Sequence, residues 1–247
     1  MIKRNSYIVT LAAVFVLLSG FIYLAHYLIF RDAHHIFLYL VGDLAFLPLE
    51  VFLVVIVIER ILTRRETRTK LEKLNMVVGA FFSEVGNHLL QSLLQHFNNK
   101  EEIAAHLNVT GTWTKKDFQK AADYAHDLPI DINARSLNLN QLKEYLSARR
   151  EFLLTLLENP SLLEHDRFTD LLWAVTHVDE ELEARPSLNE LSERDLDHIA
   201  DDLRRMYDHM ASEWLDYVEQ LKSMYPFIFS LVVRTHPFQP NPSPSVT

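Results

Sequence analysis

Two long apolar runs stand at the start of the chain, and a polar sequence with helical periodicity follows them. Residues 7–30 contain no Asp, Glu, Lys or Arg, and residues 36–58 carry two carboxylates as their only charges. A helix needs roughly 20 apolar residues to cross a bilayer, so both runs are long enough. The pattern therefore predicts a two-helix transmembrane hairpin.

The rest of the chain reads as a set of helices. Apolar positions recur there at helical spacing, and no glycine lies between Thr112 and the C-terminus. The pattern predicts an all-α protein, in which the transmembrane hairpin precedes a cytoplasmic helical bundle. We expect four parts, which are a membrane anchor at 1–59, a basic juxtamembrane segment with an amphipathic helix at 60–98, an acidic helical domain at 99–235 and a disordered, proline-rich tail at 236–247.

Capping residues locate several of these helices. Thr114 and Asp117 have the spacing of a capping box, and Ser192 and Asp195 repeat it before the longest apolar stripe. Pro160 suits a helix start. We expect helices over residues 114–126, 140–157, 161–183 and from 192 onward, with residues 226–233 continuing the last one, packing on the bundle or touching the bilayer.

One stripe lies just after the second apolar run. Its members alternate by three and four residues, which is the spacing of a buried helix face or of a coiled-coil seam. A buried face is the commoner meaning, and we also name the stripe as the candidate assembly face of a homo-oligomer. Its members are Leu71, Leu74, Val78, Phe81 and Val85.

Basic residues predict the orientation in the membrane. Lys3 and Arg4 precede the first run, and Arg31 is the only lysine or arginine between the two runs. Residues 60–75 carry six basic and two acidic side chains. The positive-inside rule therefore predicts a multi-pass protein of the inner (cytoplasmic) membrane with both termini in the cytoplasm. If the first run were instead a cleaved signal peptide, the domain would still face the cytoplasm.

Charge and composition limit the classes of partner that we expect. Residues 76–247 carry 15 basic and 27 acidic side chains, so a nucleic-acid partner is not expected. The basic segment suits a surface of anionic lipid headgroups. The chain has no cysteine, which excludes disulfides and thiolate metal sites. We expect the lipid bilayer, a further copy of the chain or another protein as partners.

Two carboxylates interrupt the second apolar run. Asp43 and Glu50 are seven residues apart, so they share one helix face, and Pro48 between them is expected to kink the helix. An ionised carboxylate in the membrane centre costs roughly 2.5–3.5 kcal/mol, so each needs a partner or a proton. In an antiparallel hairpin His26 is the candidate partner of Asp43. There are two interpretations. The carboxylates hold helices together through polar contacts, or they form a proton or cation path in an oligomer.

Acid–histidine pairs at i,i+4 spacing raise the question of a metal. They are Glu84/His88, His177/Glu181, His198/Asp202 and His209/Glu213. Di-iron helical bundles use helix-borne carboxylates and histidines, but their Glu-x-x-His pairs are missing here. Acids are so frequent in this domain that such pairs also arise by chance. We expect no metal, no other cofactor and no catalytic residue, because no nucleotide-binding or nucleophile signature is present.

Three stretches resemble a known group of proteins. They are FLYLVGDLAFLPLEV at 37–51, LEKLNMVVGAFFSEVG at 71–86 and YPFIFSLVVRTHPF at 225–238. The group consists of uncharacterised prokaryotic membrane proteins with two spans and a helical cytoplasmic domain. The likeness covers most of the chain. It implies the architecture and carries over no catalytic residue.

These observations favour a non-enzymatic, membrane-anchored helical protein with an interaction, scaffold or sensory role. The first alternative is an oligomeric ion or proton conductor that uses Asp43 and Glu50. The second alternative is a metal-binding helical bundle.

Overall fold

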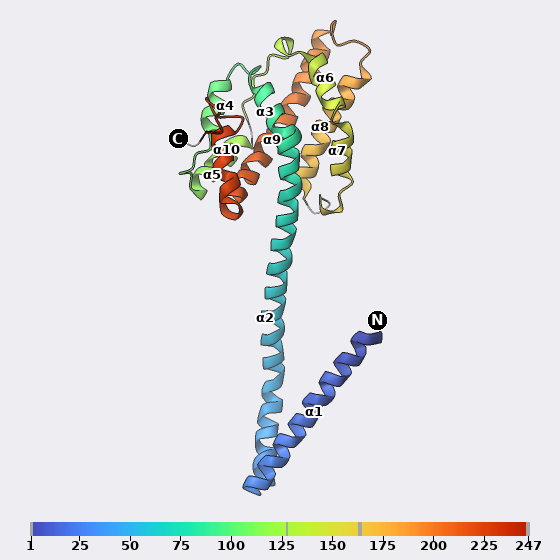
Figure 1. The fold of residues 1–247 in the computed structure, drawn as a ribbon, viewed down its shortest axis with the longest axis vertical. Helices are drawn as coiled ribbons and strands as arrows, with labels where there is room; N and C mark the ends of the chain where they lie inside the picture. Colours follow the sequence, from blue (N-terminus) through green and yellow to red (C-terminus); the bar gives the residue numbers. More distant parts are fainter. Residues whose placement is uncertain (1, 127, 163–164, 246–247) are drawn as a thin grey trace. The chain divides into compact units, whose positions relative to one another are not determined.

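The computed structural model describes residues 2–126, 128–162 and 165–245, and the side chains of these residues except 2–9, 65–71 and 161. The chain divides into two compact units, Met1–Thr67 and Arg68–Thr247. Figure 1 shows helices throughout. Among the described residues no strand forms, and one isolated bridge pairs Phe97 with Ile132. The all-α prediction is confirmed.

The first unit contains α1 (Ile2–Phe30) and the first part of α2 (Ala33–Phe81). The two helices meet at a short turn, in which Arg31 adopts a positive φ of 51°. Asp32 starts α2, because its Oδ1 accepts a hydrogen bond from the backbone N–H of His35 at 3.1 Å. Helix α2 is continuous across Pro48, and the kink expected there stays a prediction.

The second unit is a bundle of shorter helices that pack around one long helix. Its central helix is α9 (Glu193–Met224), which contacts α3, α5, α8 and α10 (Figure 1). The other elements are the π-helical turn η1 (Phe82–Gly86), α3 (Asn87–Leu94), α4 (Lys100–Leu107), α5 (Lys115–Ala125), η2 (Ala134–Ser136), α6 (Leu139–Ser147), α7 (Arg150–Leu157), η3 (Pro160–Leu162), α8 (Asp166–Ala184) and α10 (Pro226–Thr235).

The core of the second unit follows the apolar stripe of α9. Side chains three and four residues apart along this helix are buried, as the amphipathic pattern predicts. These side chains lie on a helix that contacts α8 most extensively and also contacts α5 and α10. The buried apolar residues of α9 include Ile199, Leu203, Met206, Met210, Trp214, Val218 and Leu221.

The stripe after the second apolar run lies inside this core. Leu74 and Val78 are 6% and 3% exposed, and Phe81 and Val85 are fully buried. The Phe81 ring packs edge-on against Phe168 of α8. The structure therefore corrects the assignment of an assembly face, because these side chains contribute to the core of their own domain. The side chain of Leu71 lies outside the described residues.

Local capping signals located helix starts well. Thr114 and Asp117 form the expected capping box of α5, and Ser192 caps α9 by accepting from the backbone N–H of Asp195 at 3.2 Å. The predicted helix at 140–157 is instead two helices, α6 and α7. Arg149 lies at the break, where its Nε donates to the carbonyl of Glu84 at 3.2 Å. The break between the two helices therefore coincides with a contact to η1, which is distant in the sequence.

Two further boundaries differ from the expectation. The helix expected at 161–183 begins at Asp166, where the Nδ1 of His165 accepts from the backbone N–H of Phe168 at 3.1 Å. A short 3-10 turn precedes it. Residues 226–233 form the separate helix α10, which packs on α9 through Phe229.

The start of the predicted disordered tail is ordered. His236 and Phe238 are 2% and 1% exposed, and the Phe238 ring contacts Trp214 of α9. Further along, the backbone N–H of Ser243 donates to the carbonyl of Arg234 at 2.9 Å. Proline-rich composition suggested disorder, but two buried rings anchor the segment. Residues 246–247 lie outside the described part of the chain.

Candidate functional site

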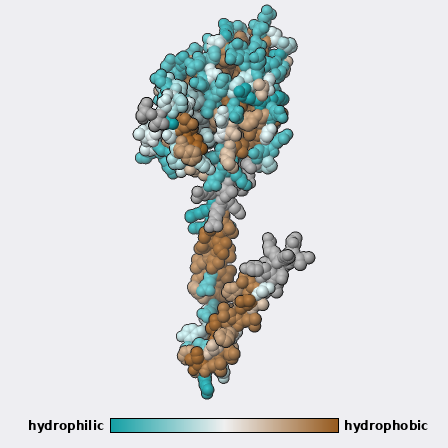
Figure 2. Space-filling model, in the orientation of Figure 1, coloured by the Kyte–Doolittle hydropathy of each residue, from teal (hydrophilic) through white to brown (hydrophobic). Residues whose placement is uncertain are grey.

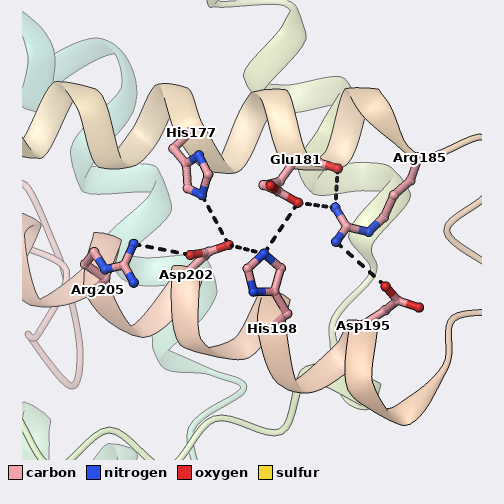
Figure 3. A network of polar contacts seen from close by, with 7 residues as sticks. All are labelled: His177, Glu181, Arg185, Asp195, His198, Asp202 and Arg205. Atoms are coloured by element: carbon pink, nitrogen blue, oxygen red, sulfur yellow. Dashed lines mark hydrogen bonds and ion pairs between the residues drawn. The ribbon is translucent and has the colours of Figure 1, made fainter.

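The strongest cluster of chemically active side chains lies between α8 and α9. His177 and Glu181 are four residues apart on α8, and His198 and Asp202 are four residues apart on α9. Residues at this spacing share one helix face. The helices run in opposite directions, so the two pairs point toward each other (Figure 3).

The connection between the helices sets the register of the two pairs. Helix α8 ends at Ala184, and Pro186 follows shortly after. Ser192 then fixes the first turn of α9, where its hydroxyl also donates to the carboxylate of Asp195 at 2.5 Å. This hydrogen bond lowers the pKa of Asp195. The connection thus places each pair within about one to three helical turns of it.

Two histidines face one carboxylate oxygen, and a second carboxylate faces one of these histidines. The Oδ2 of Asp202 lies 3.5 Å from the Nε2 of His177 and 3.4 Å from the Nε2 of His198. The same His198 nitrogen lies 3.6 Å from the Oε2 of Glu181. One ligand atom from each of Glu181, His198 and Asp202 lies within 4.8 Å of the other two. One nitrogen and two oxygens therefore face a common centre, and His177 lies beside it, next to Asp202.

Arginines hold the outer sides of the two carboxylates. The Nη1 of Arg185 donates to the Oε2 of Glu181 at 2.6 Å, and the Nη1 of Arg205 donates to the Oδ1 of Asp202 at 3.4 Å. The hydrogen bond from Arg185 lowers the pKa of Glu181, so this carboxylate is ionised at neutral pH. Both carboxylates are oriented before any ligand arrives.

Burial distinguishes the acid at the centre from its neighbours. The side chain of Asp202 is 4% exposed, whereas those of His177 and His198 are 44% and 54% exposed. No hydrogen bond reaches the buried Oδ2 of Asp202. The imidazole nitrogens stand beyond the 2.7–3.2 Å that is typical of such bonds. A buried carboxylate oxygen is thus left facing two histidines and open solvent behind them.

The other acid–histidine pairs do not form such a site. The ring of His88 stacks on Tyr145 with centroids 4.3 Å apart, and burial lowers its pKa. The carboxylate of Glu213 faces the Nε of Arg167 at 3.2 Å. One feature of the sequence distinguishes the pairs that form this cluster from the others. Only the pairs of 177/181 and 198/202 lie on consecutive helices at similar distances from their connection.

The structure does not bring the candidate intramembrane residues together. The side chains of Asp43 and Glu50 are exposed on α2, and neither has a polar partner among the side chains described for the first unit. His26 instead lies 4.7 Å from the ring of Phe30 and 6.2 Å from that of His35, between centroids. His26 lies close to the turn, which explains its contact with the start of α2. The expected His26–Asp43 contact is not among the contacts of these residues.

Comparisons with known proteins support the two-part organisation. Residues 70–234 match the family described as "Uncharacterized protein MJ1433, C-terminal helical domain", and residues 3–62 match "MJ1433, N-terminal helical domain". The chain is 40% identical to "Uncharacterized protein MJ1433" of Methanocaldococcus jannaschii over 236 residues, which are 96% of this chain and 94% of that protein. No solved structure matches the chain.

Proposed function

The chain belongs to the MJ1433 family of proteins with two helical domains, and we propose that it is a membrane-anchored protein whose helical domain binds another protein or a further copy of the chain. In this proposal the first unit spans the cell membrane twice. The second unit, Arg68–Thr247, lies in the cytoplasm. The proposal assigns no catalytic step to the chain.

The apolar surface of the first unit carries the proposal. Thr10–Phe30 and Ala33–Arg64 are long and apolar enough to cross a membrane, and their most apolar windows are 0% buried. Figure 2 shows hydrophobic surface along these helices, whereas the second unit is mostly hydrophilic. Soluble proteins rarely expose apolar patches above a few hundred Å². A lipid bilayer is the environment that would cover this apolar surface.

The two exposed carboxylates support contact between chains within the membrane. A charged group at membrane depth needs a partner or a proton, and Asp43 and Glu50 have none among the described side chains of their own unit. Both lie on α2, two helical turns apart. A second copy would supply His26, or a protonated carboxyl, as a hydrogen-bonding partner. We therefore include a homo-oligomer in the proposal.

The topology can be tested with single cysteines because the chain has none of its own. His34→Cys places an exposed thiol in the first turn of α2, next to the connection between the spans, and Gly111→Cys places one on an exposed loop of the second unit. With a membrane-impermeant maleimide on intact cells, we expect labelling of the first variant. The second variant should react only after the cells are permeabilised. Labelling of both in intact cells, or release of the protein by alkaline carbonate, would refute the proposed arrangement.

Oligomeric state can be measured by light scattering of the full chain in detergent. We expect a defined oligomer for the wild type and a smaller mass for Glu50→Gln. Ser230→Ala, a change at an exposed polar position of α10, is the control and should leave the mass unchanged. A monomer in all three samples would contradict the oligomer. Conductance in liposomes that Glu50→Gln abolishes would instead favour the alternative of an ion or proton conductor.

A further inference from the structure

We propose that Glu181, His198 and Asp202 form a binding site for a divalent transition-metal ion of the zinc class, with His177 beside the buried carboxylate. The site lies wholly within the second unit, between α8 and α9 (Figure 3). It does not depend on membrane insertion or on the oligomeric state. Its function would be to join the two longest helices of the domain near their connection.

The ligand atoms are of the right kind. Zinc prefers imidazole nitrogen and carboxylate oxygen when no thiolate is present, and the chain has no cysteine. Calcium and magnesium prefer oxygen ligands alone, so the histidine nitrogen at the centre disfavours them. The chemistry of the cluster therefore selects a borderline-soft transition metal.

The spacing of the ligand atoms fits a tetrahedral ion. With metal–ligand bonds of about 2.0–2.2 Å, the ligand atoms of a tetrahedron stand about 3.3–3.6 Å apart. The Nε2 of His198 lies 3.4 Å from Asp202 and 3.6 Å from Glu181, and the Nε2 of His177 lies 3.5 Å from Asp202. The two separations from His198 match the edges of such a tetrahedron, whereas His177 lies outside the group of three residues whose ligand atoms are mutually close. All three separations are long for direct hydrogen bonds.

The buried carboxylate of Asp202 is the second, independent observation. Its side chain is 96% buried, and its Oδ2 points at both histidine nitrogens without a hydrogen bond. Leaving a charged oxygen buried and unsatisfied costs free energy. A cation at the centre would satisfy it. The other oxygen, Oδ1, is already held by Arg205, which orients Oδ2 toward the centre.

The surrounding charges suit a divalent ion. Glu181 and Asp202 together balance the charge of such an ion, while Arg185 and Arg205 remain on the outer sides of the two carboxylates. Arg185 shares the Oε2 of Glu181 with the proposed metal, so Glu181 should contribute less to affinity than Asp202 does. The half-exposed histidines leave a path from solvent to the centre.

Calorimetric titration of the full chain in detergent with Zn²⁺, after treatment with a chelator, tests the site. We expect one Zn²⁺ per chain at pH 7.5. His198→Gln and Asp202→Asn should each weaken binding at least about tenfold, the loss typical of a disturbed metal site. His198 is half-exposed, so its substitution should leave the fold intact. His209→Gln changes another histidine of α9 outside the cluster and should bind like the wild type.

Cobalt provides a geometric readout. Substituted Co²⁺ should give the strong visible absorption of a tetrahedral site, and His198→Gln should reduce it. If the wild type binds no Zn²⁺ in the micromolar range, the proposal is wrong. It is equally wrong if binding survives His198→Gln unchanged, or falls as much with His209→Gln. In those cases the cluster is a network of ion pairs between α8 and α9.

Discussion

The ring of Phe238 packs edge-on against Trp214, with centroids 4.9 Å apart, and so joins the C-terminal segment to the centre of α9. His236 lies two residues before Phe238, and its ring makes two hydrogen bonds with the backbone. Its Nε2 donates to the carbonyl of Val109 at 3.1 Å, and its Nδ1 accepts from the N–H of Phe238 at 3.2 Å. Burial lowers the pKa of His236 to about 4, so the ring is neutral at physiological pH. The C-terminal segment is thus part of the core.

Phe238→Ala should destabilise the domain because it empties a site that is 1% exposed. Truncation of a buried phenylalanine typically costs about 3–5 kcal/mol, and we expect about 3 kcal/mol at this terminal position. Urea denaturation of the full chain in detergent, followed by circular dichroism, measures the loss. Phe227→Ala removes a ring that is 75% exposed and is the matched control. Equal effects of the two changes would show that the segment is not anchored.

Gly86 ends the π-helical turn, where two buried rings leave no space for a side chain. A Cβ at this position would lie 2.5 Å from the Cδ1 of Phe82 and 2.8 Å from the Cε1 of Phe81. We expect Gly86→Ala to cost about 1–2 kcal/mol, because overpacking outweighs the gain in helix propensity. The measurement is again the free energy of unfolding.

Gly79→Ala, near the end of α2, provides the comparison. There the nearest atom is the terminal Oη of Tyr217 at 3.0 Å, which belongs to a half-buried side chain that can shift. The strain and the gain in helix propensity should roughly cancel. A stabilised Gly86→Ala, or a larger loss at Gly79, would contradict this description of the packing.

Glu213 makes stability depend on pH in the neutral range. Burial raises the pKa of Glu213 from 4.5 to about 7. The folded protein therefore keeps this proton at a pH where the unfolded chain has lost it. The stabilisation is fully present below pH 4.5 and is lost as the pH rises through about 7.

Glu213→Gln keeps the protonated shape at every pH and removes this dependence. Relative to the wild type, we expect the variant to gain about 1–3 kcal/mol of stability between pH 5 and pH 8. Denaturation curves at both pH values measure the difference. Glu158→Gln, at an exposed position, should track the wild type. A constant difference between Glu213→Gln and the wild type would show that Glu213 does not titrate in this range.

Arg150 neutralises a fully buried carboxylate. Its Nη1 donates to the Oδ2 of Asp179 at 2.6 Å, and the Asp179 side chain is 0% exposed. Removing one partner of a buried pair costs about 3–5 kcal/mol, and we expect the lower value for Arg150→Met because Arg150 itself is partly exposed. Thermal unfolding of the full chain in detergent measures the loss.

Two further variants separate the buried pair from the surface one. Arg150→Met combined with Asp179→Asn should recover much of the loss, since no buried charge remains. Glu180→Gln removes only the exposed partner of Arg150 and should change stability by less than about 1 kcal/mol. If Glu180→Gln destabilises as much as Arg150→Met, the buried carboxylate is not the cause.

Patterns that act locally were readable from the sequence alone. The apolar runs, the helical periodicity and the caps at Thr114 and Ser192 each depend on residues within a few positions of one another. They determined the all-α class, the two apolar helices and the starts of α5 and α9. Hydrogen bonds inside a helix and its cap involve near neighbours, so tertiary structure seldom overrides them.

Only the tertiary structure decided which of these helix faces meet. The stripe at 74–85 is spaced equally well for a dimer seam and for a core, and packing against α8 made it core. The proline-rich tail is anchored by Trp214, a residue distant in sequence. His177 and Asp202 come together because two helices turn back on each other. Side-chain contact between separate elements depends on packing in three dimensions, which periodicity along the chain does not specify.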